Sequence, residues 1–119
     1  MRLILVEADP LLRTGYALCL LNEGWRVDAF GRARAEDLLR QRQDVIVLDA
    51  NLVGGDGQPL WLAVAPELRT PLIVLALSPE QEEALRRAPY DNVFHLVKPF
   101  SLRRLVHLIR AVTAYREVA

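Results

Sequence analysis

Lysine is almost missing from this chain, which has one lysine against fourteen arginines. Because arginine carries the positive charge everywhere else, we expect the ammonium of Lys98 to do something that a guanidinium does poorly. Contact with a phosphoryl or carboxylate oxygen in a tight site is such a role. Cysteine is equally scarce: the single Cys19 lies on an apolar helical stretch and predicts a buried thiol. One cysteine excludes a disulfide framework and predicts a reducing, cytoplasmic location.

Net charge and long apolar runs are also lacking. Fifteen acidic residues balance fifteen basic ones, so we expect no direct nucleic acid binding by this domain through its bulk field. No apolar run approaches the roughly 20 residues of a membrane span, which predicts no membrane segment. A glycine-rich phosphate loop, a nucleophile elbow and a cysteine–histidine pair in motif context are missing too, which argues against a stand-alone enzyme.

What the 119 residues do contain is a regular alternation of short apolar runs and helical patterns, with more than half of the residues hydrophobic. The pattern predicts strands at 2–6, 27–30, 45–49, 72–75 and 93–97. It predicts helices at 10–22, through 36–40, at 60–68, after Ser78 and after Ser101. Such alternation predicts an α/β fold, with a parallel sheet covered by helices on both faces.

Three of the predicted strands end in charged residues. Glu7 and Asp9 follow the first strand, Asp49 ends the third, and Lys98 follows the fifth. Because ligands of open α/β sheets bind at the carboxyl ends of the strands, these side chains are expected in one crevice. Clustered carboxylates suit Mg²⁺, and an aspartate can act as the nucleophile of phosphoryl transfer. The cation and Lys98 would then neutralise the incoming charge.

In their order and spacing these residues resemble the receiver domain of two-component response regulators. The motifs that carry the resemblance are Glu7-Ala8-Asp9-Pro10, Asp49, Gly55-Asp56-Gly57 and Lys98-Pro99-Phe100. The resemblance covers all 119 residues and implies one receiver domain over 1–119. The implied fold is a flavodoxin-like (βα)5 three-layer sandwich with the five-stranded sheet in the order 2-1-3-4-5.

The resemblance also implies an activity and its partners. A sensor histidine kinase or phosphotransfer protein would pass a phosphoryl group to Asp49, with Lys98 beside it. Catalysis would be confined to the domain's own phosphorylation and dephosphorylation. Mg²⁺ would be bound by Glu7, by Asp49 and by the backbone carbonyl of Asn51. The family's switch positions fall on Ala76 and His95.

Three positions depart from the family pattern. Ala8 stands where a second metal-binding acid is expected, Ala76 replaces a hydroxyl residue, and His95 replaces an aromatic residue. Mg²⁺ binding is therefore expected to be weak. Two readings stay open: a phosphorylatable switch, and an atypical receiver that acts as an interaction or dimerisation module without phosphorylation.

Several of these residues also have simpler structural roles. Asp9 precedes Pro10 and is expected to cap a helix, with a role as replacement metal ligand as the alternative. Ser78 is expected to open a helix through a capping box with Gln81, rather than to serve as a displaced switch hydroxyl. Asp56 is expected to form a turn before Gly57.

The end of the chain bears on output. Lys98-Pro99-Phe100-Ser101-Leu102, followed by an arginine-rich helix, resembles transcription factors with a winged-helix half. The domain is therefore expected to be the front of a longer regulator of transcription. Homodimerisation is expected through the fourth helix, fifth strand and fifth helix. There Leu108 and Phe94 stand where charged residues are usual, and as exposed groups they predict a hydrophobic contact.

Overall fold

The computed structural model describes residues 1–118, with side chains through Ala114. Strands and helices alternate strictly along the chain. In order they are β1 Arg2–Val6, α1 Pro10–Asn22, β2 Arg26–Phe30, α2 Ala35–Arg40, β3 Val45–Asp49, α3 Leu60–Val64, β4 Leu72–Ala76, α4 Pro79–Arg87, β5 Val93–Val97 and α5 Leu102–Val118.

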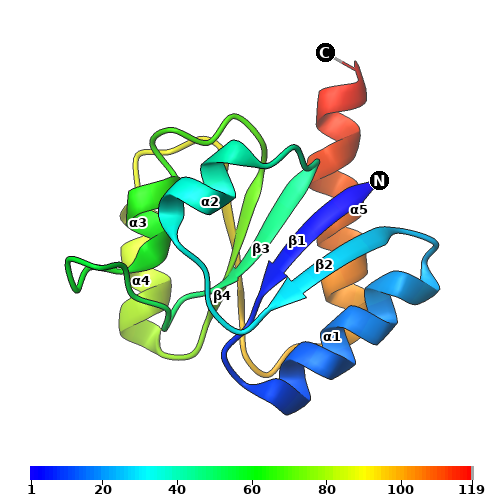
Figure 1. Ribbon diagram of the computed structural model, residues 1–119, viewed down its shortest axis with the longest axis horizontal. Coiled ribbons are helices and arrows are strands. Elements are labelled where there is room, and N and C mark those ends of the chain that lie inside the picture. Colours follow the sequence, from blue (N-terminus) through cyan, green and yellow to red (C-terminus); the bar gives the residue numbers. More distant parts are fainter. Residues whose placement is uncertain (119) are drawn as a thin grey trace.

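The five strands form one parallel sheet in the order β2-β1-β3-β4-β5 (Figure 1). Helices α1 and α5 cover one face, and α2, α3 and α4 cover the other. The predicted flavodoxin-like fold and strand order are confirmed. The parallel arrangement places the carboxyl ends of all five strands at one edge of the sheet.

The core is divided by the sheet into two layers, because successive side chains of a strand point to opposite faces. In β1, Leu3 and Leu5 pack with α1 and α5, while Ile4 and Val6 pack with α2, α3 and α4. All side chains of β3 and β4 are buried, as expected for parallel strands covered on both sides. Each fully buried aliphatic side chain contributes about 1.5–3 kcal/mol to folding.

The ends of the helices follow the local sequence signals. The Oδ1 atom of Asp9 accepts hydrogen bonds from the backbone N–H groups of Leu11, at 2.9 Å, and Leu12, at 3.3 Å. Gly24 ends the α1 segment with a φ of 85°, a conformation that favours glycine. The capping box of Ser78 and Gln81 starts α4. The predicted caps at Asp9 and Ser78 are confirmed.

Several boundaries differ from prediction, and one of them is the start of β2, which begins one residue early, at Arg26. Helix α3 ends at Val64, not at residue 68, because Pro66 has no N–H group to continue the hydrogen-bond ladder. The N–H groups of Glu67 and Leu68 both bond to the carbonyl of Val64 in a closing turn. Strand β4 extends by one residue to Ala76, which pairs with Val97 of β5.

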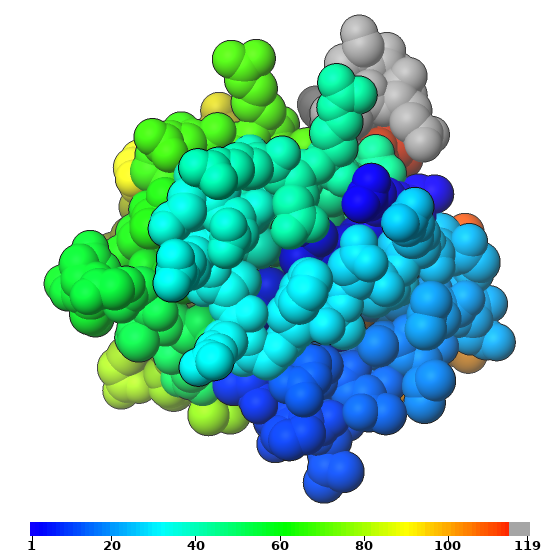
Figure 2. Space-filling view, in the orientation of Figure 1, coloured from blue at the N-terminus to red at the C-terminus, as the bar shows by residue number. Residues whose placement is uncertain are grey.

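The two edges of the sheet are more exposed than its centre. Strand β2 is an edge strand, and Phe30 at its end is 40% exposed. Figure 2 shows the side of the molecule on which the segments from α1 to α2, blue to cyan, form much of the surface.

None of the helices among the described residues is both long and apolar enough to cross a membrane.

Candidate functional site

The charged residues at the strand ends meet at the carboxyl edge of the sheet. Glu7 follows β1, Asp49 ends β3, and Lys98 follows β5. The Nζ atom of Lys98 lies 2.6 Å from Oε1 of Glu7 and 3.7 Å from Oδ1 of Asp49. The predicted convergence of these three side chains is confirmed. Lys98 directly follows the edge strand β5. Its backbone N–H bonds to the carbonyl of Ala76 on β4 at 2.8 Å, and its side chain reaches Asp49 and Glu7.

Glu7 is the most buried member of the group, with no exposed surface. Its Oε2 atom accepts a hydrogen bond from the backbone N–H of Asp9 at 3.1 Å, while Oε1 bonds to Lys98. Burial raises the pKa of Glu7 above its ordinary value of 4.5, and the neighbouring carboxyl of Asp49 adds to the rise. The hydrogen bond from Lys98 opposes it. Two carboxyl groups share one ammonium, so the site attracts a further positive charge.

Asp49 is 3% exposed and is bonded into the loop that follows it. Its Oδ1 atom accepts a hydrogen bond from the backbone N–H of Asn51 at 3.0 Å. The side chain of Asn51 in turn accepts a hydrogen bond from Nε2 of Gln81 at 2.7 Å. The loop after β3 is therefore connected to the start of α4 across the mouth of the site. Sequence reasoning assigned Gln81 only to the capping box and missed this connection.

The site has few acidic side chains that are free to bind a metal ion. Position 8 is exposed and carries only the methyl group of alanine. Oδ1 of Asp9 is engaged in the helix cap, so a ligand role for Asp9 stays a prediction. Within residues 1–118, no group of three or more histidine, cysteine or acidic side chains is placed to bind a metal ion. The ligand set of Glu7, Asp49 and the backbone carbonyl of Asn51 therefore stays a prediction.

The two predicted switch positions, Ala76 and His95, have different surroundings. Ala76 is fully buried at the end of β4 and has no hydroxyl to donate. The hydroxyl of Ser78 accepts a hydrogen bond from the N–H of Gln81, so it belongs to the helix cap. His95, on β5, pairs with the backbone of Val74, and its Nε2 atom lies 3.4 Å from Oε2 of Glu82 on α4. The ring is a quarter exposed, as expected for a packed side chain.

An apolar groove of about 480 Å³ opens next to Lys98. Its rim carries exposed leucines: Leu11 is 85% exposed and Leu77 is 58% exposed. At its floor Tyr16 stacks on Phe100, with ring centroids 5.4 Å apart. Burial, with the charges of nearby acids, raises the pKa of Tyr16 to about 12, so its phenol stays neutral. The groove, called here the Leu11 groove, joins α1 to the loops after β4 and β5.

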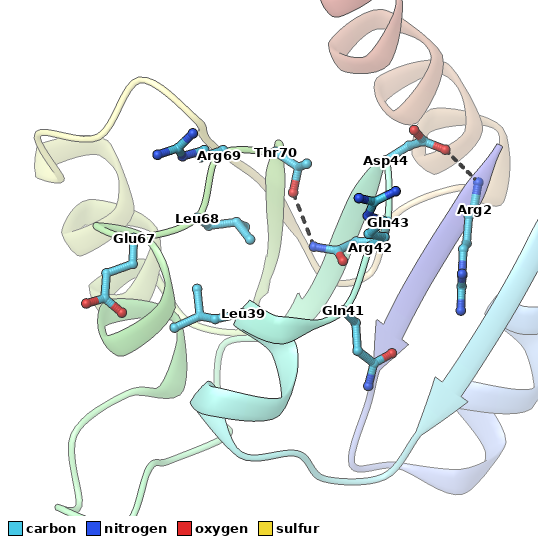
Figure 3. Close-up of a pocket in the computed structure, with 10 residues that line it drawn as sticks. All are labelled: Arg2, Leu39, Gln41, Arg42, Gln43, Asp44, Glu67, Leu68, Arg69 and Thr70. Carbon is cyan, nitrogen blue, oxygen red and sulfur yellow. Dashed lines mark hydrogen bonds between the residues drawn. The ribbon is translucent and has the colours of Figure 1, made fainter.

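A second cavity, of about 550 Å³, lies at the opposite, amino-terminal edge of the sheet (Figure 3). Within it Gln43 donates a hydrogen bond to the Thr70 hydroxyl at 3.3 Å, and Asp44 accepts one from the backbone of Arg2 at 2.8 Å. These bonds tie the starts of β1, β3 and β4 together. The cavity contains none of the acids at the carboxyl edge, so the candidate chemistry lies at the other end.

The face formed by α4, β5 and α5 differs from expectation in one respect. Phe94 and Leu108 were expected to be exposed, but both are half-buried and pack against the core layer of α1 and α5. They line a mainly apolar cavity of about 660 Å³ together with Val112 and Pro71. Both side chains belong to the layer between the sheet and α5, because Phe94 points to that side from β5 and Leu108 lies on α5. The face therefore offers a shallow apolar hollow, with Arg104 exposed nearby on α5.

Proteins similar in sequence to this chain include transcriptional regulatory proteins. The transcriptional regulatory protein PmrA of Pectobacterium parmentieri is 29% identical over 117 residues, which cover 94% of this chain and 52% of PmrA. The transcriptional regulatory protein AfsQ1 of Streptomyces coelicolor is 33% identical over 112 residues, which cover 92% of this chain and 50% of AfsQ1. The chain spans about half the length of these curated relatives. No family model matches the chain.

Solved structures are similar over nearly the whole chain. The receiver domain of a sensor histidine kinase from Pseudomonas aeruginosa PAO1, described with magnesium in its active site cleft, is 25% identical with a TM-score of 0.71, and the match covers 95% of this chain and 97% of that one. A CheY-like receiver domain protein from Methanospirillum hungatei JF-1 shares the fold with a TM-score of 0.76 at 18% identity, over 98% and 95% of the two chains. With its sheet order, its strand-end residues and these relatives, the chain belongs to the receiver domains of response regulators.

Proposed function

We propose that this domain accepts a phosphoryl group on Asp49 from a sensor histidine kinase or phosphotransfer protein, and thereby regulates an effector domain or partner. The observation that carries the proposal is the meeting of Asp49 and Lys98 at the carboxyl edge, with Nζ 3.7 Å from Oδ1. A carboxylate oxygen of Asp49 would form the bond to phosphorus while the bond from phosphorus to the donor histidine nitrogen breaks. The domain's catalysis would be limited to gaining and losing this group.

Lys98 has the central electrostatic role in this proposal. In the unmodified site its ammonium is closer to Glu7 than to Asp49, by the distances 2.6 and 3.7 Å. Phosphorylation would replace the single negative charge of the Asp49 carboxylate by about two on the phosphoryl oxygens, a gain of about one negative charge in the same space. We infer that Lys98 then turns from Glu7 toward a phosphoryl oxygen, which leaves Glu7 to take up a proton or a cation.

The proposed ligands are oxygen atoms, which Mg²⁺ prefers, but there are few of them. All three candidate donors are oxygen atoms, as Mg²⁺ requires, yet Glu7 is already bonded to Lys98 and Ala8 contributes nothing. We propose that Asp49 and the carbonyl of Asn51, with Glu7, hold the ion weakly. When bound, Mg²⁺ would neutralise charge on the phosphoryl oxygens.

The Leu11 groove is the surface that we assign to the phosphoryl donor protein. It borders Lys98 directly, and exposed Leu11 and Leu102 flank it. Exposed apolar side chains next to a charged site suit a partner helix with an apolar stripe. A partner seated there would lie within reach of the carboxyl edge of the sheet, where Asp49 is.

The alternative function is an interaction module that works without phosphorylation. Ala76 supports it, because the end of β4 has no hydroxyl to respond to a phosphoryl group. The short bond between Lys98 and Glu7 also supports it, because the lysine already has a partner. The 1–119 segment would then serve as one binding domain of a longer regulator, as its coverage of about half of PmrA suggests.

Labelling with a small phosphodonor separates these two functions. Incubation with acetyl phosphate and Mg²⁺ is expected to add one phosphoryl group to the natural chain, and none to Asp49→Asn, by intact-mass spectrometry. Asp56→Asn is the matched control, because Asp56 is exposed in the neighbouring loop and is expected to leave labelling unchanged. Equal labelling of Asp49→Asn would show that the acceptor is another residue. No labelling of the natural chain by any donor would favour the interaction module.

Self-association is proposed through the α4–β5–α5 face. Leu108→Arg places a charge at the apolar hollow that Leu108 and Phe94 line, and is expected to weaken association because burying an unpaired charge is unfavourable. His107→Arg, at the exposed neighbouring position, is the control and is expected to have little effect. Sedimentation at low and high salt measures the result. Association is expected to depend little on salt and not on Asp49; its loss in Asp49→Asn would contradict the proposal.

A further inference from the structure

A chain of hydrogen bonds runs from Asp49 to the start of α4 without passing through position 76. Oδ1 of Asp49 accepts from the backbone N–H of Asn51 at 3.0 Å, and Oδ1 of Asn51 accepts from Nε2 of Gln81 at 2.7 Å. These bonds join residues of β3, of the loop after it and of α4. The two side chains that meet, those of Asn51 and Gln81, are 30 positions apart in the sequence.

The amide of Gln81 is used at both ends. Its Oε1 atom accepts hydrogen bonds from the N–H groups of Leu77, at 2.7 Å, and Ser78, at 3.3 Å. Its own backbone N–H donates to the hydroxyl of Ser78 at 3.2 Å. One side chain therefore holds the loop after β4 through its oxygen and the loop after β3 through its nitrogen. A displacement of Asn51 would therefore change a hydrogen bond to the first turn of α4.

We propose that the Asn51–Gln81 hydrogen bond transmits the state of Asp49 to the β4–α4 loop, in place of the hydroxyl that Ala76 lacks. The inference rests on the proposed function for its signal, since phosphorylation is the event that would change Asp49. A change at a site shifts a distant element only through contacts that differ between two states. Here the differing contact is the bond from Asn51 to the carboxylate, which a phosphoryl group on Asp49 would alter.

The expected size of the effect follows from the bonds involved. Asn51 is exposed and Gln81 is half-buried, so the bond between them has the strength of an ordinary hydrogen bond near solvent. Such a bond changes a local equilibrium by about two- to tenfold. The relay is accordingly a modest coupling, which suits a domain that lacks one part of the usual switch.

Hydrogen exchange of the Leu77 and Ser78 amides measures the coupling, because both amides bond to Gln81. Four proteins are compared by NMR: the natural chain, Asp49→Ala, Asn51→Ala and the double variant. Asp49→Ala is expected to lower protection of these amides by about two- to tenfold in the natural background. In the Asn51→Ala background the same substitution is expected to have no effect. Additive effects of the two substitutions would overturn the proposal.

Ser78→Ala separates transmission from simple support of the helix. It removes the hydroxyl of the capping box and weakens the start of α4, but leaves the Asn51–Gln81 bond in place. Protection is expected to fall, while the response to Asp49→Ala is retained. A lost response in Ser78→Ala would show that the capping box, and not the relay, carries the effect.

A pair of acidic substitutions gives a second test. In Asn51→Asp the new carboxylate still accepts from Gln81, and in Gln81→Glu the amide of Asn51 can turn and donate, so each single variant is expected to keep the response. In the double variant two carboxylates face each other and neither can donate a hydrogen bond, so the response to Asp49→Ala is expected to be lost. A response that survives in the double variant would contradict the relay.

Beryllofluoride with Mg²⁺ distinguishes failure of the relay from failure of the proposed function. If it changes the amide signals around Asp49, and the change reaches Leu77 and Ser78 only when Asn51 and Gln81 are intact, both inferences hold. If it changes nothing around Asp49 while the coupling to Asp49→Ala persists, the relay stands and phosphorylation at Asp49 is contradicted.

Discussion

Replacement of Lys98 by methionine is expected to lower the free energy of unfolding by about 2–4 kcal/mol at pH 8, and by much less at pH 5. The substitution removes the only ammonium from two carboxyl groups that are almost fully buried, at 0% exposure for Glu7 and 3% for Asp49. A buried charge that loses its partner is strongly destabilising. Methionine keeps the length of the side chain, so the loss of charge dominates the effect.

The dependence on pH follows from the pKa of Glu7. Burial and the carboxyl of Asp49 already raise this pKa, and Lys98 holds it down. Without Lys98 the folded state retains a proton to higher pH, while the unfolded state releases it near the ordinary value of 4.5. Between these two values the folded state binds more protons, so stability falls as pH rises. The loss is therefore greatest above the raised pKa of Glu7 and shrinks as the pH approaches 4.5.

Urea unfolding of the natural protein and of Lys98→Met at pH 5 and pH 8 tests this expectation. Arg87→Met is the matched control, because it removes the cation of an exposed ion pair with Glu83. An exposed pair contributes about 0–1 kcal/mol, with little change between these two pH values. A loss for Lys98→Met that equals the control, or that is the same at both pH values, would mean that Lys98 does not balance the buried carboxyl pair.

Sequence reasoning succeeded where the fold depends on periodicity. Apolar runs placed all five strands, and parallel strands bring their carboxyl ends together whatever side chains they carry. The meeting of Glu7, Asp49 and Lys98 could therefore be predicted. The caps at Asp9 and Ser78 were also predictable, because such hydrogen bonds join residues only two or three positions apart.

Prediction failed where the result depends on the path of a loop or the rotation of a helix. The choice of Lys98 between Glu7 and Asp49 is a matter of about one ångström, by the distances 2.6 and 3.7 Å. The Asn51–Gln81 bond joins the loop after β3 to the first turn of α4, and no sequence period connects these two residues. The half-burial of Leu108 follows from how α5 sits on the sheet, because a residue at the boundary of an apolar stripe can face either way.

Ala8 explains why the metal site is expected to be weak, and Ala8→Asp is expected to tighten Mg²⁺ binding by about tenfold or more. The residue is exposed and lies between Glu7, which is bonded to Lys98, and Asp9, which caps α1. A carboxylate at position 8 would be bonded neither to Lys98 nor to the first turn of α1, so it could bind the cation directly. It would also add negative charge to the group formed by Glu7, Asp49 and Lys98.

Without Mg²⁺, Ala8→Asp is expected to be less stable than the natural protein at pH 7, because like charges near buried carboxyl groups repel. Bound Mg²⁺ should reverse this loss, since a ligand that binds only the folded state stabilises it. Ala8→Asn is the matched control: it has nearly the same shape and one neutral oxygen, so its effect on affinity should be clearly smaller.

NMR titration of the Asp49, Ala50 and Asn51 amides with Mg²⁺ measures the three affinities, and thermal unfolding with and without Mg²⁺ measures the stabilities. The natural protein is expected to respond little below millimolar Mg²⁺, and Ala8→Asp well below that concentration. Tight binding by the natural protein would show that Glu7 and Asp49 suffice despite the bond to Lys98. Equal affinities for Ala8→Asp and Ala8→Asn would show that the charge at position 8 is not what the site lacks.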